Sequence, residues 1–213
     1  MTAMTGTGIL STVINVVAES LLIPVLILLV IFILLVLVEV GGTLAEYSNR
    51  TKISDEELDN IINSIAVSKS SEEIKRIIND SKINKESKNV LMKIINTSNL
   101  KENTREAYVR KIIENQEYAY AKTLRKTELL TRVSSGCGLL GTLIPLGPGL
   151  ASLGTGDIAT LSAQLIVAFN TTTVGLSCSL VAHVISKIRK MWYKDDTGLI
   201  YTISEAILEA NYD

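Results

Sequence analysis

The sequence predicts an all-α membrane protein with three transmembrane helices, long helical cytoplasmic extensions and an N-out/C-in orientation. The first observation is the placement of charge, because all 21 Lys and Arg residues lie within residues 50–132 or 187–194. A soluble domain of this length scatters charges over its whole surface, since every face meets water. A single soluble globule is therefore excluded. The net charge of −1 also gives no reason to expect nucleic-acid binding.

The second observation is the run Leu21–Val38, eighteen residues without a charge. About 20 apolar residues cross roughly 30 Å of hydrocarbon. The run lacks a basic segment before it and a cleavage site after it, so it is not a signal peptide. We expect a transmembrane helix at 21–40. Residues 1–20 are then an extracytoplasmic segment, in which 9–18 is expected to lie in the interface as a short amphipathic helix.

The third observation is a charge-free stretch at 133–156 that is rich in glycine and proline. It is expected to form the second span, an inner helix packed against protein, because small residues such as Gly138 and Gly141 let helices approach closely in lipid. Pro145 and Pro148 are expected to break or kink that helix.

The third span is expected at 158–186, where His183 is the single titratable group apart from Cys178. Polar side chains at membrane depth normally face a bundle interior or a water-filled path. Asp157 lies in a very short link, so the second and third spans are expected to form a hairpin. The positive-inside rule places the N-terminus outside and both basic blocks, within 41–132 and 187–213, in the cytoplasm.

The cytoplasmic parts are expected to be helical. Ser54 with Glu57 forms a capping-box pattern, and Ser70 with Glu73 repeats it. The mixed charges of residues 54–130 are typical of a solvated helical surface. The further helices expected are one at 85–95, a long one from about 102 into the second span, a continuation of the third span through 187–193, and a short terminal helix at about 198–210.

The sequence contains no residue pattern that is typical of an active site, so we expect that the protein is not an enzyme and binds no cofactor. One histidine cannot form a metal cluster, and Gly6-Thr7-Gly8 lacks the lysine of a phosphate loop. Cys137 and Cys178 lie in apolar stretches and are expected to be small buried residues.

Hydroxyl groups are the polar chemistry that remains in the spans. Thr142 lies in the middle of the second span, and Asn170, Thr171, Thr172 and Thr173 lie in the middle of the third. A threonine hydroxyl both donates and accepts, so it can hold water or a carboxyl group in a narrow channel. Alternatively, each hydroxyl bonds the carbonyl four residues back.

These residues carry a resemblance. The run Gly138-Leu-Leu-Gly-Thr142, the charge-free hairpin and the stretch Thr171-Thr-Thr-Val-Gly-Leu176 resemble the MotA/TolQ/ExbB proton-channel family. The three-span plan resembles the ExbB/TolQ branch of that family. The similarity covers about residues 105–193, with the earlier part agreeing in layout only.

The resemblance implies a homopentamer in the inner membrane around a single-span ExbD/TolR/MotB-like partner that carries a membrane aspartate. It implies that Thr142 and Thr172 line the ion pathway. The chain departs from the ExbB/TolQ pattern at Val167, where those branches carry a glutamate, and in its two prolines at 145 and 148.

Two functions follow as hypotheses. The leading one is a ring-forming subunit of an ion-driven membrane motor, with the proton as the expected ion and sodium as the alternative. The other is a non-conducting oligomeric scaffold whose small residues only pack the helices. A secondary transporter is disfavoured, because three spans without an inverted repeat leave too little for a substrate cavity.

Overall fold

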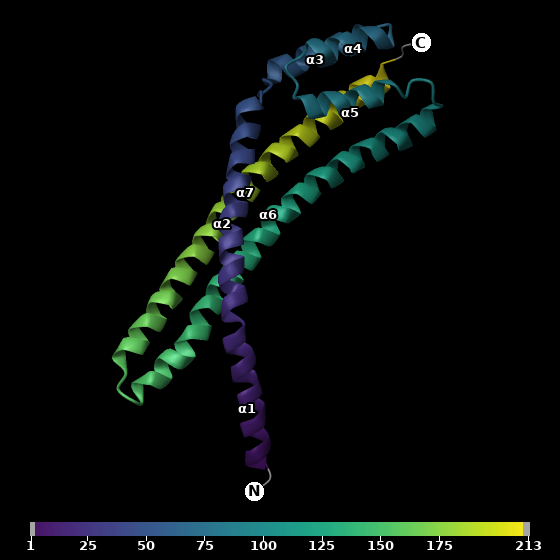
Figure 1. The fold of residues 1–213 in the computed structure, drawn as a ribbon. Coiled ribbons are helices and arrows are strands. Elements are labelled where there is room, and N and C mark those ends of the chain that lie inside the picture. The colour runs from purple at the N-terminus through teal and green to yellow at the C-terminus, as the bar shows by residue number, and fades with distance from the viewer. Residues whose placement is uncertain (1–2, 211–213) are drawn as a thin grey trace. The chain divides into compact units, whose positions relative to one another are not determined.

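The computed structural model describes the backbone of residues 3–210 and the side chains of residues 8–210. It is 88% helical, with no strand in the part of the chain that it describes. Figure 1 shows the helices in chain order. They are α1 (Ala3–Ser20), α2 (Leu22–Asn49), α3 (Asp55–Val67), α4 (Ser71–Asp80), α5 (Lys85–Ile95), α6 (Glu102–Leu153) and α7 (Ile158–Glu209).

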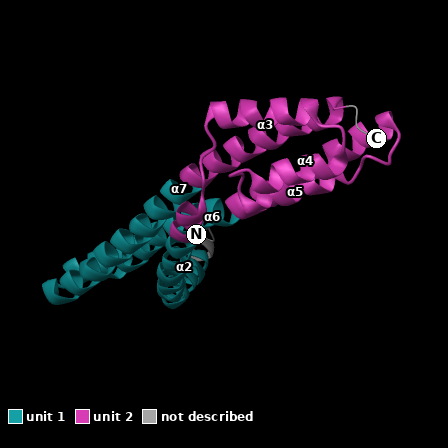
Figure 2. Ribbon diagram, turned by 90° about the horizontal axis from the view of Figure 1, so that it is seen from above, with its two compact units in different colours: residues 1–42, 126–186 teal, residues 43–125, 187–213 magenta. Residues whose placement is uncertain are grey.

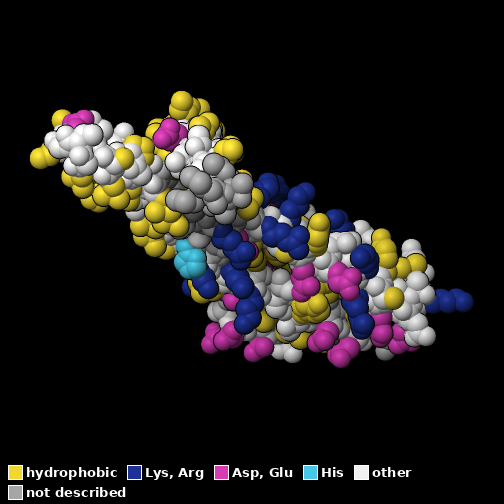
Figure 3. All heavy atoms as spheres, turned by 90° about the horizontal axis from the view of Figure 1, so that it is seen from below, with side chains coloured by type: hydrophobic (Ala, Val, Ile, Leu, Met, Phe, Trp, Pro, Cys, Tyr) yellow, Lys and Arg dark blue, Asp and Glu magenta, His cyan; other side chains and the backbone are white. Residues whose placement is uncertain are grey.

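The chain forms two compact units, coloured separately in Figure 2. Residues 1–42 and 126–186 make up the first, which we name the apolar unit. Residues 43–125 and 187–213 make up the second, the charged unit. On the face drawn in Figure 3, the blue Lys and Arg side chains lie among magenta Asp and Glu side chains.

Three helical segments are long and apolar enough to cross a membrane: Gly8–Asn49, Glu102–Leu153 and Ile158–Glu209. Each carries one of the three spans expected from the sequence. Their inner faces share a small apolar core, in which Val25, Leu29, Phe32 and Val36 of α2 pack with residues of α6 and α7. The outer faces are exposed leucine, isoleucine and valine, as a lipid-facing surface requires.

Helix α6 is not broken at its prolines, contrary to one of the alternatives expected for that segment. Pro145 and Pro148 both lie inside the continuous helix. Each removes one backbone N–H and leaves one carbonyl without its helical partner, a loss that neighbouring helices can offset. The expected packing against protein holds for one face only, since Leu139 and Leu143 on the other face are 60% and 57% exposed in the single chain.

The link between α6 and α7 is as short as expected. Gly156 turns the chain with a φ of +73°, a conformation that favours glycine. Asp157 then caps the start of α7, because its carboxylate accepts from the Thr160 backbone N–H at 3.0 Å and also from the Thr160 hydroxyl. These two bonds hold the pKa of Asp157 below its usual range.

In the charged unit, the caps form largely where the sequence signals them. Ser54 and Glu57 make the full capping box of α3. Ser70 caps α4 by accepting from the Glu72 N–H, while the Glu73 carboxylate accepts from the Lys69 N–H instead of closing the box. The isoleucines of α3, α4 and α5 then pack with those of α7 into one core; its fully buried members are Ile65, Ile74, Ile78, Leu91, Ile94, Ile95, Ile203 and Ile207.

A separate terminal helix at 198–210 was the wrong expectation, because α7 runs without a break to Glu209. Gly198 disfavours helix locally. The tertiary environment outweighs this, since Ile200, Ile203 and Ile207 on the same face are 0–1% exposed in the core of the charged unit.

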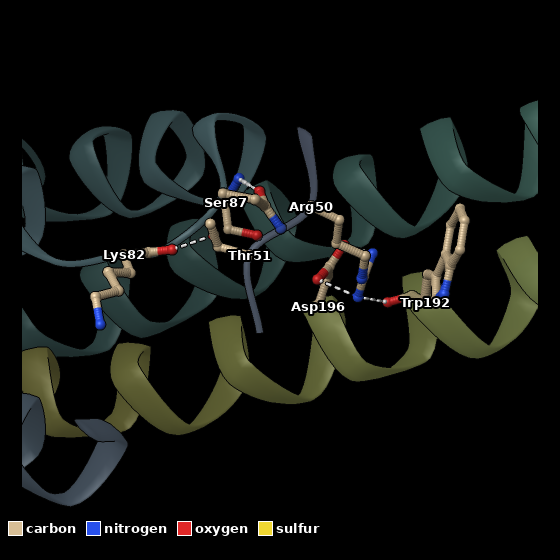
Figure 4. Close-up of polar contacts among 7 residues, drawn as sticks. Arg50, Thr51, Lys82, Ser87, Trp192 and Asp196 are labelled. Atoms are coloured by element: carbon tan, nitrogen blue, oxygen red, sulfur yellow. Dashed lines mark hydrogen bonds and ion pairs between the residues drawn. The ribbon is translucent and has the colours of Figure 1, made fainter. Parts of the chain in front are cut away.

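The end of α2 is fixed to α7 by partly buried ion pairs, and Figure 4 draws one of them, between Arg50 and Asp196. The Arg50 guanidinium forms a two-pronged ion pair with Asp196, at 2.8 and 3.1 Å, and donates to the Trp192 carbonyl. Four residues before Arg50 and seven residues before Asp196, Glu46 of α2 pairs with Arg189 of α7 at 3.1 Å. Burial raises the pKa of Asp196 even though Arg50 lowers it.

Candidate functional site

The site lies where α6 and α7 pack as an antiparallel hairpin inside the apolar unit. Glycines set the distance between the two helices. A β-carbon placed on Gly175 would lie 2.5 Å from the Gly138 Cα and 2.7 Å from the Ser134 carbonyl oxygen. One turn further, a β-carbon on Gly141 would lie 2.6 Å from the Thr171 Cβ. The two backbones therefore approach as closely as small residues allow.

This approach brings two of the expected threonines together. The Thr142 and Thr172 hydroxyls contact each other although the residues are thirty positions apart. Each hydroxyl also lies 3.0 Å from a carbonyl four residues back, Gly138 for Thr142 and Ala168 for Thr172. Both side chains are half-buried. Each hydroxyl therefore makes both the contact across the two helices and the hydrogen bond to a carbonyl of its own helix, so these two interactions are not alternatives.

The other polar residues expected in the pathway are placed differently. Thr171 is buried against Gly141, and its hydroxyl donates to the Val167 and Ala168 carbonyls. Thr173 is exposed, and its hydroxyl donates to the Phe169 carbonyl. Asn170 is also exposed. The structure thus brings together one hydroxyl pair, rather than all five groups.

The surroundings of the pair hold no charge. Residues 133–156 and 158–186 contain no Asp, Glu, Lys or Arg, and His183 is exposed on α7. A threonine hydroxyl does not titrate in the physiological range, but it can pass a hydrogen bond between a donor and an acceptor. Within the described residues, no group of three or more His, Cys, Asp or Glu side chains could hold a metal ion.

Two residues that matter to this arrangement were missed by the sequence analysis. Gly175 is the counterpart of Gly138, and its place in the Thr-Thr-Thr-Val-Gly-Leu stretch was the available signal. Thr127 is fully buried between the basic residues Lys126 and Arg132 of the sequence, and its hydroxyl has no partner within the described residues. Nothing in its sequence surroundings distinguishes Thr127 from an exposed helical threonine.

Comparison with known proteins agrees with this geometry. No curated protein matches the chain. The model of the MotA/TolQ/ExbB proton channel family, however, matches residues 58–200, a range that includes both hairpin spans and most of the charged unit. The chain therefore belongs to the MotA/TolQ/ExbB proton channel family and is a multi-pass membrane protein.

Proposed function

We propose that this chain is the ring-forming subunit of a proton-driven motor in the inner membrane, and that it is not an enzyme. The observation that supports the proposal most directly is the contact between the Thr142 and Thr172 hydroxyls. The pair lies at membrane depth, in a hairpin that has no acid or base of its own. A pair of hydroxyls can relay or hold a proton donor without carrying a charge across the bilayer.

A group that titrates must then come from another chain. Several copies of this subunit, expected to be five, would surround a single-span partner of the ExbD/TolR/MotB kind. Its membrane carboxyl group would accept the proton beside the threonine pair. Each charge that crosses the membrane potential supplies about 2.3 kcal/mol per 100 mV, enough to favour one ring position over another.

The orientation belongs to the same proposal. The basic residues lie at the C-terminal end of the first span, the N-terminal end of the second and the C-terminal end of the third. The positive-inside rule therefore favours an N-out/C-in chain whose charged unit lies in the cytoplasm. The Gly154–Asp157 link would face outside.

The close glycine packing at 138 and 175 also suits the alternative function, a non-conducting scaffold. One measurement, proton uptake by proteoliposomes, distinguishes the motor subunit from the scaffold. The chain is reconstituted in proteoliposomes with a single-span partner of the ExbD/TolR/MotB kind, and proton uptake is followed after a pH gradient and a potential are imposed.

A motor subunit gives uptake that requires both proteins and is lost when the partner's membrane aspartate is replaced by asparagine. A scaffold gives no uptake above that of protein-free liposomes. A sodium gradient run in parallel identifies the ion, since uptake of sodium without protons would contradict the proton assignment.

A further inference from the structure

A groove of about 600 Å³ lies between the C-terminal end of α1 and one face of α6, inside the apolar unit. Asn15 and Glu19 line it on the α1 side. Glu19 lies two residues before the apolar run that starts at Leu21, so the carboxylate lies at the boundary of the hydrocarbon. The wall on α6 is almost entirely apolar; it consists of Leu140, Leu143, Ile144, Gly147, Pro148 and Ala151.

The dimensions of the groove match one leaflet of a bilayer. The α6 wall extends from Ala151, near the end of the helix, to Leu140. At 1.5 Å per residue these positions are about 16 Å apart along the axis. Half of the hydrocarbon core is about 15 Å thick. The groove therefore has a polar end at the interface and an apolar end near the mid-plane, the profile of an amphiphile with an acyl chain.

The polar end selects the headgroup. The side chains of Asn15 and Glu19 form no hydrogen bond or ion pair within residues 8–210, whose side chains the structure describes. No Lys or Arg occurs in residues 1–49 or 133–186 to neutralise Glu19. A primary ammonium complements a carboxylate and an amide oxygen, because it supplies both positive charge and N–H donors. A quaternary ammonium has no N–H to donate, and a net anionic headgroup would be repelled.

We propose that this groove binds a phospholipid with an ethanolamine headgroup. The ammonium lies at Glu19 and Asn15, and one acyl chain follows the α6 wall toward Leu140. The proposal rests on the membrane location of the chain and not on ion conduction, so the two can fail separately.

The test counts bound lipid by native mass spectrometry of the full chain. The detergent-solubilised protein is supplemented in turn with dioleoyl phosphatidylethanolamine, phosphatidylcholine or phosphatidylglycerol. We expect the ethanolamine lipid to be retained most strongly. Glu19→Gln should weaken that retention about fivefold, the size of one partly solvated ion pair. Asp157→Asn is the matched control, because Asp157 is also an exposed acid beside a span but does not line the groove.

A second pair of variants tests the acyl chain separately. A β-carbon at Gly147 meets nothing within 4 Å, and Gly147 lines the groove, so Gly147→Leu should fill it without disturbing the protein. Gly136→Leu is the control, since Gly136 is equally open and lies outside the groove. We expect Gly147→Leu to lose the lipid and Gly136→Leu to retain it, with neither variant melting below the wild-type temperature.

Three results would overturn the proposal. The first is equal retention of the three lipids. The second is full retention of the ethanolamine lipid by both Glu19→Gln and Gly147→Leu. The third is an oligomer that retains no lipid, which would indicate that a second copy of the chain covers the groove.

Discussion

The hydroxyl of Thr142 on α6 contacts the hydroxyl of Thr172 on α7, directly beside the packed pair Gly141 and Thr171. The two contacts are one turn from the pair Gly138 and Gly175, where the backbones themselves touch. The polar contact therefore depends on the glycine contacts. Any group that widens the hairpin also separates the hydroxyls.

The first prediction concerns the closest contact of the hairpin. Gly175→Ala places a methyl group 2.5 Å from the Gly138 Cα and 2.7 Å from the Ser134 carbonyl oxygen. Because backbone atoms cannot move aside as a flexible side chain can, we expect a loss of about 1–3 kcal/mol in the free energy of unfolding. Chemical unfolding in detergent measures it. Gly136→Ala, where nothing lies within 4 Å, should be neutral or stabilising; equal losses at both positions would refute the packing argument.

The second prediction tests whether proton uptake depends on the distance between the two helices when both hydroxyls are still present. Gly141→Ala drives a methyl group into Thr171 and keeps both hydroxyls of the pair. We expect proton uptake to fall about tenfold, equivalent to about 1.4 kcal/mol in the barrier. Adding Thr171→Gly makes room for the methyl group and should restore uptake. A double variant as impaired as Gly141→Ala alone would show that helix spacing is not the cause.

The third prediction concerns the C-terminal part of α7. Ile203 is fully buried in the core of the charged unit, so Ile203→Ala removes packed methylene groups and leaves a cavity. We expect a loss of about 2–5 kcal/mol in the free energy of unfolding. The neighbouring Thr202 is exposed, and Thr202→Ala should change the stability by less than about 0.5 kcal/mol. Thermal melting of the two variants, measured in parallel, tests this difference in stability.

The fourth prediction is a pH dependence. Asp196 has a folded-state pKa that burial raises and Arg50 lowers, and Arg50→Met removes the lowering group. An acid whose pKa is higher in the folded state than in the unfolded state loses stability as pH rises between the two values. The variant should therefore be about 3 kcal/mol less stable than wild type at pH 7, because the buried charge is unpaired.

The deficit of Arg50→Met should shrink as the pH falls toward 4, because the raised pKa of Asp196 in the folded variant lets its carboxylate take up a proton there and lose its unpaired charge. Melting temperatures measured from pH 4 to pH 8 test this. A deficit that is constant over that range would mean that lost packing on Trp192, which Arg50 also covers at 5.3 Å, is the whole effect.

Local signals in the sequence predicted local structure well. The helix at 85–95 has the bounds expected for it, and the long helix begins at Glu102 as expected. In both cases the deciding groups, caps and hydrophobic spacing, lie within a few residues of each other. The charge-free stretches likewise predicted three apolar helices.

Features that depend on distant residues were not predictable in the same way. Arg50 and Asp196 are 146 positions apart, and nothing in either neighbourhood indicates a buried pair. The helix break expected near Gly198 does not occur. Burial of one face of α7 stabilises the helix there by more than the low helix propensity of glycine destabilises it. The family resemblance singled out Thr142 and Thr172 as residues of one pathway, whereas their hydroxyl contact and the glycine contacts beside it required the structure.

The most direct test of the central claim is proton uptake by proteoliposomes that contain the partner and variants of the threonine pair. Thr142→Val and Thr172→Val remove one hydroxyl each with little change of shape, while Thr142→Ser keeps the hydroxyl. Thr131→Val is the matched control, since the Thr131 hydroxyl bonds only the Thr127 carbonyl on the same helix.

We predict that each valine variant strongly lowers proton uptake. The double variant should take up protons no more slowly than the slower of the two single variants, because both hydroxyls serve one step. Thr142→Ser and Thr131→Val should keep the uptake of the unmodified chain. Wild-type uptake in both Thr142→Val and Thr172→Val would contradict the account.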